Sequence, residues 1–357
     1  MSDRLRLKTL IAAVVFFLFS MSGMLIYAHE KAIVITEGPH DVLQNQIDSV
    51  QSTQPQEQSL QKPRSFVFDA NSQAGERLCI PLQDGVKAEN VIIENRYMSK
   101  ELRISVGQCE VEFYNTQAVY GDVTGIESGT YEETVNGVLM RFQLTDIFEC
   151  TSVLDGNKLY IDLVPPAKIY EKIVVIDPVY SDLAASAENG SLAEKDLALD
   201  VAKRLKTKLD ATDIKAYFTR LDDKEVENVE RLGLVEEVGA DFILSIGAAE
   251  NPENSEKYGT EVVYNGNFFT PGLNSVVLAD CALREVVIQI SGRGNGLLEA
   301  TENESVIWNA QVPAALLKVG YLSNKQEAAL LSREDYREKI AEGIYQAILK
   351  VYEGEEN

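Results

Sequence analysis

Histidine is almost absent from this chain of 357 residues. The two histidines are His29 and His40, so none follows residue 40. Serine–histidine–aspartate triads, histidine general bases and histidine-ligated zinc sites all depend on this side chain. The sequence therefore excludes all three kinds of site from everything after residue 40.

Basic residues and cysteines are also scarce. Lys and Arg number 33 against 56 Asp and Glu, which gives a formal charge of −23. Such a charge repels phosphate backbones, so we expect no nucleic-acid partner. None of the four cysteines lies in a CxxC pair, which argues against a thiolate zinc site or a redox pair. We expect free thiols, with a structural disulfide as the alternative.

One long uncharged run occurs near the N-terminus, at residues 9–28, behind three basic residues. A helix of about 20 such residues can span the hydrocarbon core of a membrane. Basic residues ahead of it place the N-terminus in the cytoplasm. We predict a cytoplasmic tail (1–8), a single-pass signal anchor (9–28) in the cell membrane, and an extracytoplasmic location for the bulk of the chain. A cleaved signal peptide ending near Ala28 is the alternative.

The middle of the chain changes from a polar segment to a strand-rich one. Residues 29–64 carry little apolar periodicity, and we predict a flexible linker there. Residues 65–166 contain short β-branched and aromatic runs separated by turn clusters, and no helical stripe competes with them. This pattern predicts a small all-β sandwich domain. The expected strands lie at 66–68, 90–94, 102–106, 111–114, 138–142 and 159–163.

From residue 171 onward the hydrophobic period changes again. Residues 172–177 form a continuous apolar run, typical of a strand covered on both faces. Apolar residues then recur at four-residue spacing from Leu197 to Leu209, which indicates a helix. Further strands are expected at 216–219, 242–246, 260–264 and 314–317, with a closing helix whose apolar stripe runs from 336 to 351.

This alternation predicts an α/β domain over residues 171–353, with a mostly parallel twisted sheet flanked by helices. Sites in such sheets lie at the carboxyl ends of the strands. We therefore expect chemistry in the loops after Asp177, Ile246 and Leu317. The glycine-rich segment Gly292–Gly296 does not open a helix after a strand, so we expect a flexible loop there rather than a phosphate site.

The same loops carry motifs of a known family. The fragments, in order, are Val174–Pro178, Glu194–Asp196, Thr219–Arg220, Gly239–Ile246, Gly259–Glu261 and Val319–Asn324. In this order and spacing, residues 172–352 resemble the zinc-dependent N-acetylmuramoyl-L-alanine amidases, which cut peptidoglycan. The upstream β domain resembles the AMIN-type domain that often precedes these amidases, on the basis of Leu159–Leu163 and the domain order.

The resemblance also marks which site residues have changed. In the active family, zinc is held by a histidine in DPGHGG, the glutamate of EKD and a histidine after a later strand, and a second glutamate acts as acid and base. Tyr180 and Gly247 stand at the histidine positions and Lys318 at the catalytic glutamate, whereas Glu194 is retained. Catalytic zinc needs about three protein ligands, and its chemistry needs a proton acceptor. We therefore expect no intact catalytic site and no metal or other cofactor.

Four residues remain candidates for a groove or an ion pair, namely Glu194, Lys318, Tyr180 and Asp177. One hypothesis pairs Lys318 directly with Glu194, because an unpaired buried carboxylate costs several kcal/mol. The alternative leaves Glu194 as an acid at a helix N-terminus. The ring of Tyr180 is expected to fill the former zinc cavity, with a hydroxyl contact to a bound glycan as the alternative.

The sequence thus predicts a membrane-anchored, extracytoplasmic wall protein with an amidase-like domain. We expect a pseudoenzyme that binds peptidoglycan or a wall-associated protein, or that regulates wall remodelling, by analogy with the fold. One alternative is an active amidase that hydrolyses the muramoyl–L-alanine amide bond with a non-standard site. Another is a structural protein–protein module with no affinity for glycans.

Overall fold

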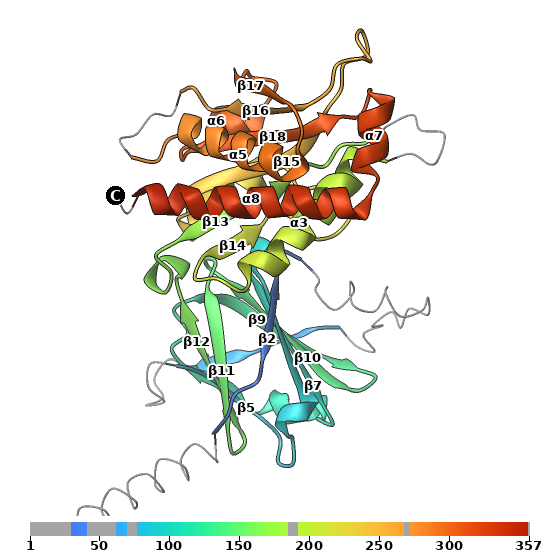
Figure 1. Ribbon diagram of the computed structural model, residues 1–357. Coiled ribbons are helices and arrows are strands. Elements are labelled where there is room, and N and C mark those ends of the chain that lie inside the picture. Colours follow the sequence, from blue (N-terminus) through green and yellow to red (C-terminus); the bar gives the residue numbers. More distant parts are fainter. Residues whose placement is uncertain (1–29, 41–61, 70–76, 185–191, 268–271, 356–357) are drawn as a thin grey trace, which may run out of the picture. The chain divides into compact units, whose positions relative to one another are not determined.

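The computed structural model describes residues 30–40, 62–69, 77–184, 192–267 and 272–355 (Figure 1). These residues divide into two compact units, one N-terminal and rich in strands, the other C-terminal and of α/β type. The predicted tail and signal anchor lie outside the described residues. In the described ranges, no helix has both the length and the apolar character needed to cross a membrane.

The N-terminal unit contains two six-stranded sheets. The strands of the first sheet are, in spatial order, β1 (Glu30–Lys31), β11 (Glu149–Asp155), β12 (Lys158–Val164), β5 (Leu78–Pro81), β8 (Ala118–Gly121) and β4 (Val67–Asp69). Those of the second are β2 (Ile35–Gly38), β6 (Val91–Arg96), β7 (Glu101–Gly107), β10 (Gly137–Leu144), β9 (Ile126–Thr134) and β3 (Arg64–Ser65). Residues of both sheets share one apolar core. The predicted β region is confirmed.

The structure differs from the sequence-based expectations in two parts of this unit. Val111–Asn115 forms a 3₁₀ helix, η3, in place of the expected strand. Its buried residues, Val111 and Tyr114, are three positions apart and therefore lie on one side of a 3₁₀ turn. Residues 30–38, expected as linker, contribute β1 and β2. Ile33 between them is buried, and the Ser152 hydroxyl donates to its carbonyl at 2.7 Å.

The C-terminal unit is built on one six-stranded sheet. Its spatial order is β14 (Lys215–Phe218), β13 (Ile173–Pro178), β15 (Phe242–Ala249), β18 (Ala314–Tyr321), β16 (Thr260–Tyr264) and β17 (Gly294–Glu299). The first four strands are parallel, whereas β16 is antiparallel to β18 and parallel to β17. Every residue of β13 and β15 is buried, as expected for strands covered on both faces. The predicted, mostly parallel sheet is confirmed.

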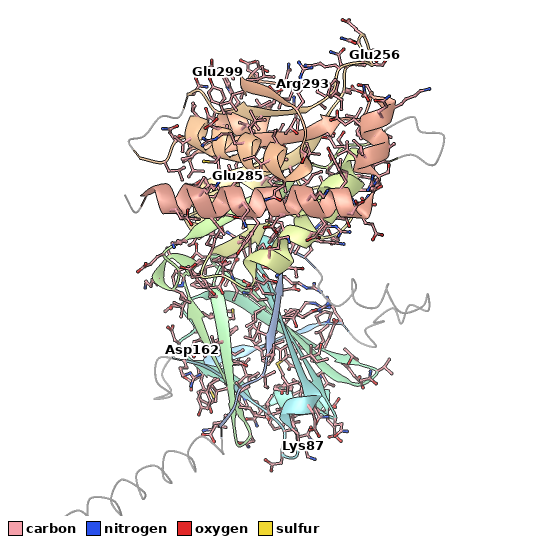
Figure 2. All side chains as sticks on the ribbon, in the orientation of Figure 1. Lys87, Asp162, Glu256, Glu285, Arg293 and Glu299 are labelled. Atoms are coloured by element: carbon pink, nitrogen blue, oxygen red, sulfur yellow. The ribbon has the colours of Figure 1, made fainter. Side chains whose placement is uncertain are left out.

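Helices flank this sheet. The long ones are α3 (Glu194–Leu209), α5 (Ser275–Ile290) and α8 (Glu334–Glu355), and the shorter ones are α4 (Asn228–Val238), α6 (Ser305–Asn309) and α7 (Lys325–Leu331). Residues of α3, α5, α7 and α8 share one apolar core with the sheet. Short 3₁₀ helices occur at η1 (Ala88–Asn90), η2 (Tyr97–Ser99) and η4 (Pro166–Lys168). Glu285 of α5, labelled in Figure 2, forms an ion pair with Lys350 of α8 at 2.7 Å.

Two features of the C-terminal unit were not expected from the sequence. Helix α5 had no counterpart among the expected elements. The segment Gly292–Gly296, expected as a flexible loop, leads into β17, which pairs with β16 from Thr260↔Gly294 onward. Backbone hydrogen bonds suffice for an edge strand, so glycine-rich residues can form one when a neighbour is available. All four cysteines are free thiols, as expected.

Candidate functional site

The candidate site lies where β13, β15 and β18 end, at the carboxyl edge of the sheet. In the register of the sheet, Gly247 of β15 is opposite Lys318 of β18, and Lys318 is opposite Glu261 of β16. Tyr180 follows the end of β13, and Glu194 is the first residue of α3. The topology therefore brings positions that are far apart in sequence to one edge of the sheet.

The Glu194 carboxylate lies in the space that a side chain at Gly247 would need. A Cβ atom on Gly247 would be 2.6 Å from Glu194 Oε1. The same oxygen accepts a hydrogen bond from the Ala248 N–H at 2.6 Å. Ala248 lies where the pairing of β15 with β18 shifts register, between Gly247 and Ala249. The absent side chain thus allows Glu194 to brace the end of β15.

The surroundings of Glu194 favour its protonated form. Its side chain is buried among protein groups, and this burial raises the pKa of the carboxyl above its ordinary value. Hydrogen bonds from Ala248 and Ser181 and the charge of Lys318 lower the pKa, but they do not outweigh burial. The charge of Glu250 raises it further. Glu194 therefore supports the end of β15 through the Ala248 N–H, and its carboxyl group is a weaker acid than that of an ordinary glutamate.

Lys318 forms its ion pairs with other carboxylates. Its ammonium is 3.8 Å from Glu304 Oε1 and 4.0 Å from Glu261 Oε1. Glu261 also accepts a hydrogen bond from the Tyr321 hydroxyl. No ion pair joins Lys318 to Glu194 in the described parts of the chain, so the direct pair expected from the sequence is replaced by these two. The cause is the register of β16 and β18, which puts Glu261 directly beside Lys318.

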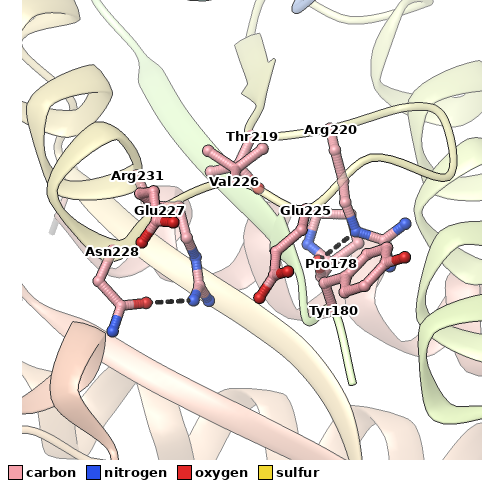
Figure 3. Close-up of a pocket in the computed structure, with 9 residues that line it drawn as sticks. All are labelled: Pro178, Tyr180, Thr219, Arg220, Glu225, Val226, Glu227, Asn228 and Arg231. Carbon is pink, nitrogen blue, oxygen red and sulfur yellow. Dashed lines mark hydrogen bonds between the residues drawn. The ribbon is translucent and has the colours of Figure 1, made fainter. Parts of the chain in front are cut away.

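Tyr180 is held between two cations. The Lys195 ammonium donates to its hydroxyl at 3.2 Å and lies 4.8 Å from the ring centroid. The Arg220 guanidinium carbon lies 5.3 Å from the same centroid (Figure 3). The hydrogen bond to Tyr180, with contributions from Asp182 and Asp223, raises the pKa of Lys195. Both the ring and the hydroxyl of Tyr180 are therefore engaged by protein groups.

Asp177 is fully buried and saturated with hydrogen-bond donors. Arg231 donates to both of its oxygens, Thr219 donates at 2.8 Å, and Ser245 donates as well. Burial alone would raise the pKa of Asp177, but the charge and hydrogen bonds of Arg231, with the two hydroxyls, lower it overall. Asp177, one of the four candidate groove residues, thus holds the ends of β13, β15 and α4 together.

Arg220 of the Thr219–Arg220 motif is a structural residue that was not among the predicted site residues. It is 1% exposed, and its guanidinium donates to three carbonyls at 2.8 Å each, those of Pro178, Val179 and Lys195, and to the carbonyl of Asp222 at 3.0 Å. These bonds fix the end of β13, the first turn of α3 and the loop after β14 relative to one another. Burial lowers the pKa of Arg220. The signal in the sequence was its place directly after the strand at 216–219.

The side chains at this edge of the sheet do not fit a catalytic zinc ion. Zinc is bound by cysteine, histidine or carboxylate ligands, usually at least three from the protein. Here one carboxylate, Glu194, stands with a glycine, a cation-bound tyrosine and the Lys318 ammonium, whose charge opposes a metal ion. Across the residues that the structure describes, no cluster of three or more histidine, cysteine or acidic side chains could hold a metal ion.

A pocket of about 170 Å³ opens beside Tyr180 (Figure 3). It lies between the end of β13, the loop after β14 and the start of α4. Its lining is mainly polar or charged and consists of Pro178, Tyr180, Thr219, Arg220, Glu225, Val226, Glu227, Asn228 and Arg231. No sequence pattern predicts this pocket, because its lining comes from two segments, 178–180 and 219–231, that meet only in the folded chain.

Comparisons with known proteins show which family the C-terminal unit is similar to. Residues 174–350 match the family model described as N-acetylmuramoyl-L-alanine amidase. The N-acetylmuramoyl-L-alanine amidase LytC of Bacillus subtilis is 28% identical over 179 residues, which cover 50% of this chain and 35% of LytC. The N-acetylmuramoyl-L-alanine amidase CwlM of Mycobacterium tuberculosis is 29% identical over 202 residues, covering 52% of this chain and 46% of CwlM.

A solved structure matches the same half of the chain. The catalytic domain of the amidase CwlV from Bacillus (Paenibacillus) polymyxa var. colistinus is 28% identical, with a TM-score of 0.46, and the match covers 51% of this chain and 99% of that domain. The matched segment spans less than half the length of LytC and of CwlM. The C-terminal half of this chain is a domain of the N-acetylmuramoyl-L-alanine amidase family, which is normally zinc-dependent and acts on peptidoglycan.

Proposed function

We propose that this protein is a membrane-anchored, extracytoplasmic wall protein whose amidase-family domain binds peptidoglycan without cutting it and so regulates wall remodelling. The observation that carries the proposal is the position of the Glu194 carboxylate. It lies 2.6 Å from where a Cβ at Gly247 would be and is bound to the Ala248 N–H. The retained family ligand thus serves the backbone in place of a metal.

The remaining steps of hydrolysis lack their groups as well. A zinc amidase needs a metal-bound water and a carboxylate that takes and returns a proton. Lys318 stands at the carboxylate position, and an ammonium cannot accept a proton. Tyr180, at a ligand position, already accepts a hydrogen bond from Lys195. Three changed positions in a domain whose sheet, helices and Asp177 network are complete support the loss of catalysis rather than of the fold.

The N-terminal half of the chain supports the proposed membrane-anchored, extracytoplasmic location. The uncharged run at 9–28 behind basic residues supports a signal anchor. The two sheets of the N-terminal unit are compatible with an AMIN-like domain that directs the chain to the envelope. A domain of a peptidoglycan-acting family fits this side of the membrane, where peptidoglycan is found.

Sedimentation with purified cell walls tests the binding half of the proposal. The full chain, in detergent, is mixed with protein-free peptidoglycan, and the pelleted fraction is measured. We expect the chain to pellet and the wall to remain undigested. If it stays in solution with pure peptidoglycan but pellets with walls that retain their proteins, the partner is a wall-associated protein. If it pellets with neither, the proposal is wrong.

An active amidase with a non-standard site is the second candidate. The retention of Glu194 at the start of α3 is the observation that favours it. Such an enzyme would release stem peptides from the glycan, which a binding protein would not. The release of stem peptides from purified peptidoglycan separates these two candidates.

A further inference from the structure

The pocket beside Tyr180 presents polar groups that the rest of the fold does not use. Glu225 is exposed and forms no hydrogen bond or ion pair with any other residue that the structure describes. Figure 3 shows its carboxylate projecting between the side chains of Arg231 and Tyr180. Asn228 accepts a hydrogen bond from Arg231 at 2.8 Å, which directs its amide oxygen into the wall. Its amide nitrogen donates to no described residue.

The cations of the pocket are fixed in the wall. Arg231 is bound to the buried Asp177. Arg220 donates its four hydrogen bonds to backbone carbonyls, so within the described residues no carboxylate neutralises it in an ion pair. The pocket therefore places an available carboxylate beside two guanidinium groups that are held by hydrogen bonds. Such an arrangement suits a ligand that carries both charges.

The size of the pocket limits the ligand further. Its volume of about 170 Å³ is smaller than the roughly 300–1,000 Å³ typical of drug-sized ligands. One amino-acid end, with an ammonium and a carboxylate on the same carbon atom, has the right scale and the right pair of charges. The ring of Tyr180 and the side chain of Val226 supply apolar wall for its carbon atoms.

We propose that this pocket binds a zwitterionic amino-acid end, with the ammonium against Glu225 and the carboxylate toward Asn228 and the guanidinium side of the wall. In peptidoglycan, the matching group is the free end of a diamino acid such as diaminopimelate in a stem peptide that is not cross-linked. The domain thereby recognises stem peptides that are not cross-linked. This inference rests on the proposed wall-binding function and names the part of the wall that the domain binds.

Calorimetric titration of the full chain with meso-diaminopimelate tests the pocket. Pimelate, which has the same carbon chain and both carboxylates but no ammonium groups, is the matched probe. We expect diaminopimelate to bind and pimelate to bind at least about tenfold more weakly, because a charge-assisted hydrogen bond is lost. Equal affinities, or no binding of diaminopimelate, would overturn the proposal.

Two variants on the same part of the fold sharpen the test. Glu225→Gln removes the free carboxylate, and we expect the affinity for diaminopimelate to fall by about tenfold or more. Glu236→Gln makes the same charge change at an exposed position of α4 outside the pocket, and we expect no effect. An unchanged affinity in Glu225→Gln contradicts the pocket.

Wall sedimentation separates a failure of the pocket from a failure of the proposed function. If the full chain pellets with peptidoglycan while Glu225→Gln leaves the affinity for diaminopimelate unchanged, only the pocket assignment is wrong. If the unaltered chain does not pellet with peptidoglycan, the proposed function is wrong whatever the titration gives.

Discussion

A single methyl group at Gly247 is enough to disturb the candidate site. In Gly247→Ala, the new Cβ would lie 2.6 Å from Glu194 Oε1, so the carboxylate must leave the Ala248 N–H. A buried donor left without its partner costs about 1–3 kcal/mol, and we expect a loss of stability of that size. Trp308, the one tryptophan of the chain, lies in the C-terminal unit, so its fluorescence in a urea titration follows unfolding of this unit.

Gly233→Ala is the matched control for this substitution. Gly233 lies in α4, and a Cβ there would have no heavy atom within 4 Å. Alanine in a helix interior is favoured over glycine by about 0.5–1 kcal/mol, so we expect unchanged or slightly increased stability. Equal losses in both variants would show that Glu194 does not fill the space at Gly247.

The pH dependence of stability is a second consequence of the Glu194 environment. Its pKa in the folded chain is raised above the ordinary value of 4.5, so the folded state holds the proton more tightly than the unfolded state. The resulting stabilisation is complete below pH 4.5 and is lost as the pH rises through the raised pKa. We expect Glu194→Gln to remove this loss.

Urea midpoints followed by Trp308 fluorescence between pH 4 and 7 measure this difference. Asp177 has a lowered pKa, so its stabilisation is present at neutral pH and is lost as the pH falls through that pKa. It contributes equally to the wild-type chain and the variant and cancels in the comparison. Wild-type and Glu194→Gln curves that stay parallel over this range would contradict a raised pKa at Glu194.

At the scale of elements, Arg220 joins β13, α3 and the loop after β14 through four hydrogen bonds to carbonyls. Lysine has no planar fork and cannot reach all of them, so Arg220→Lys leaves partly buried carbonyls without donors. We expect a loss of about 2–4 kcal/mol, measured by the same fluorescence titration. Arg284→Lys is the control, because Arg284 is exposed on α5 and forms its ion pair with Asp280 in the preceding turn, at 3.1 Å. A loss there above about 0.5 kcal/mol, or none in Arg220→Lys, would contradict this assignment.

The elements that the sequence predicted are those with a strong hydrophobic period. The buried run at 172–177 and the four-residue spacing from Leu197 to Leu209 became β13 and α3. Helix α5 was missed because its residues 275–290 are apolar on several sides and carry no clear stripe. The strand β17 depends on pairing with β16, and its glycine-rich sequence carries no period of its own.

The sequence predicted where the site residues lie in the fold, but not which groups they contact. The motifs placed Tyr180, Gly247 and Lys318 at strand ends and Glu194 at a helix start, and the structure brings them to one edge of the sheet. The partner of Lys318 could not be read from the sequence, because it depends on the register between β16 and β18.

At the scale of the whole molecule, the amidase-family fold is retained, so if its zinc ligands have been replaced as we propose, restoring them should restore the metal site. We expect a variant with Tyr180→His, Gly247→His and Lys318→Glu to retain about one zinc ion per chain after dialysis. A side chain at residue 247 would displace the Glu194 carboxylate from Ala248 and free it for the metal. Elemental analysis measures the zinc.

The matched control carries the same three substitutions and Glu194→Ala. Without the Glu194 carboxylate, we expect the zinc content to fall sharply, because zinc binding would then rest on the two introduced histidines. Zinc retention that does not depend on Glu194, or an unaltered chain that retains as much zinc as the restored variant, would contradict the proposed loss of the site.

The most direct test of the central proposal is stem-peptide release from purified peptidoglycan by the full chain, with and without added zinc. An active amidase domain of the same family serves as the positive control. We predict no release in either condition and no increase on adding zinc. Zinc-dependent release that Glu194→Ala abolishes would contradict the account, because it would show that this chain still cuts the muramoyl–L-alanine bond.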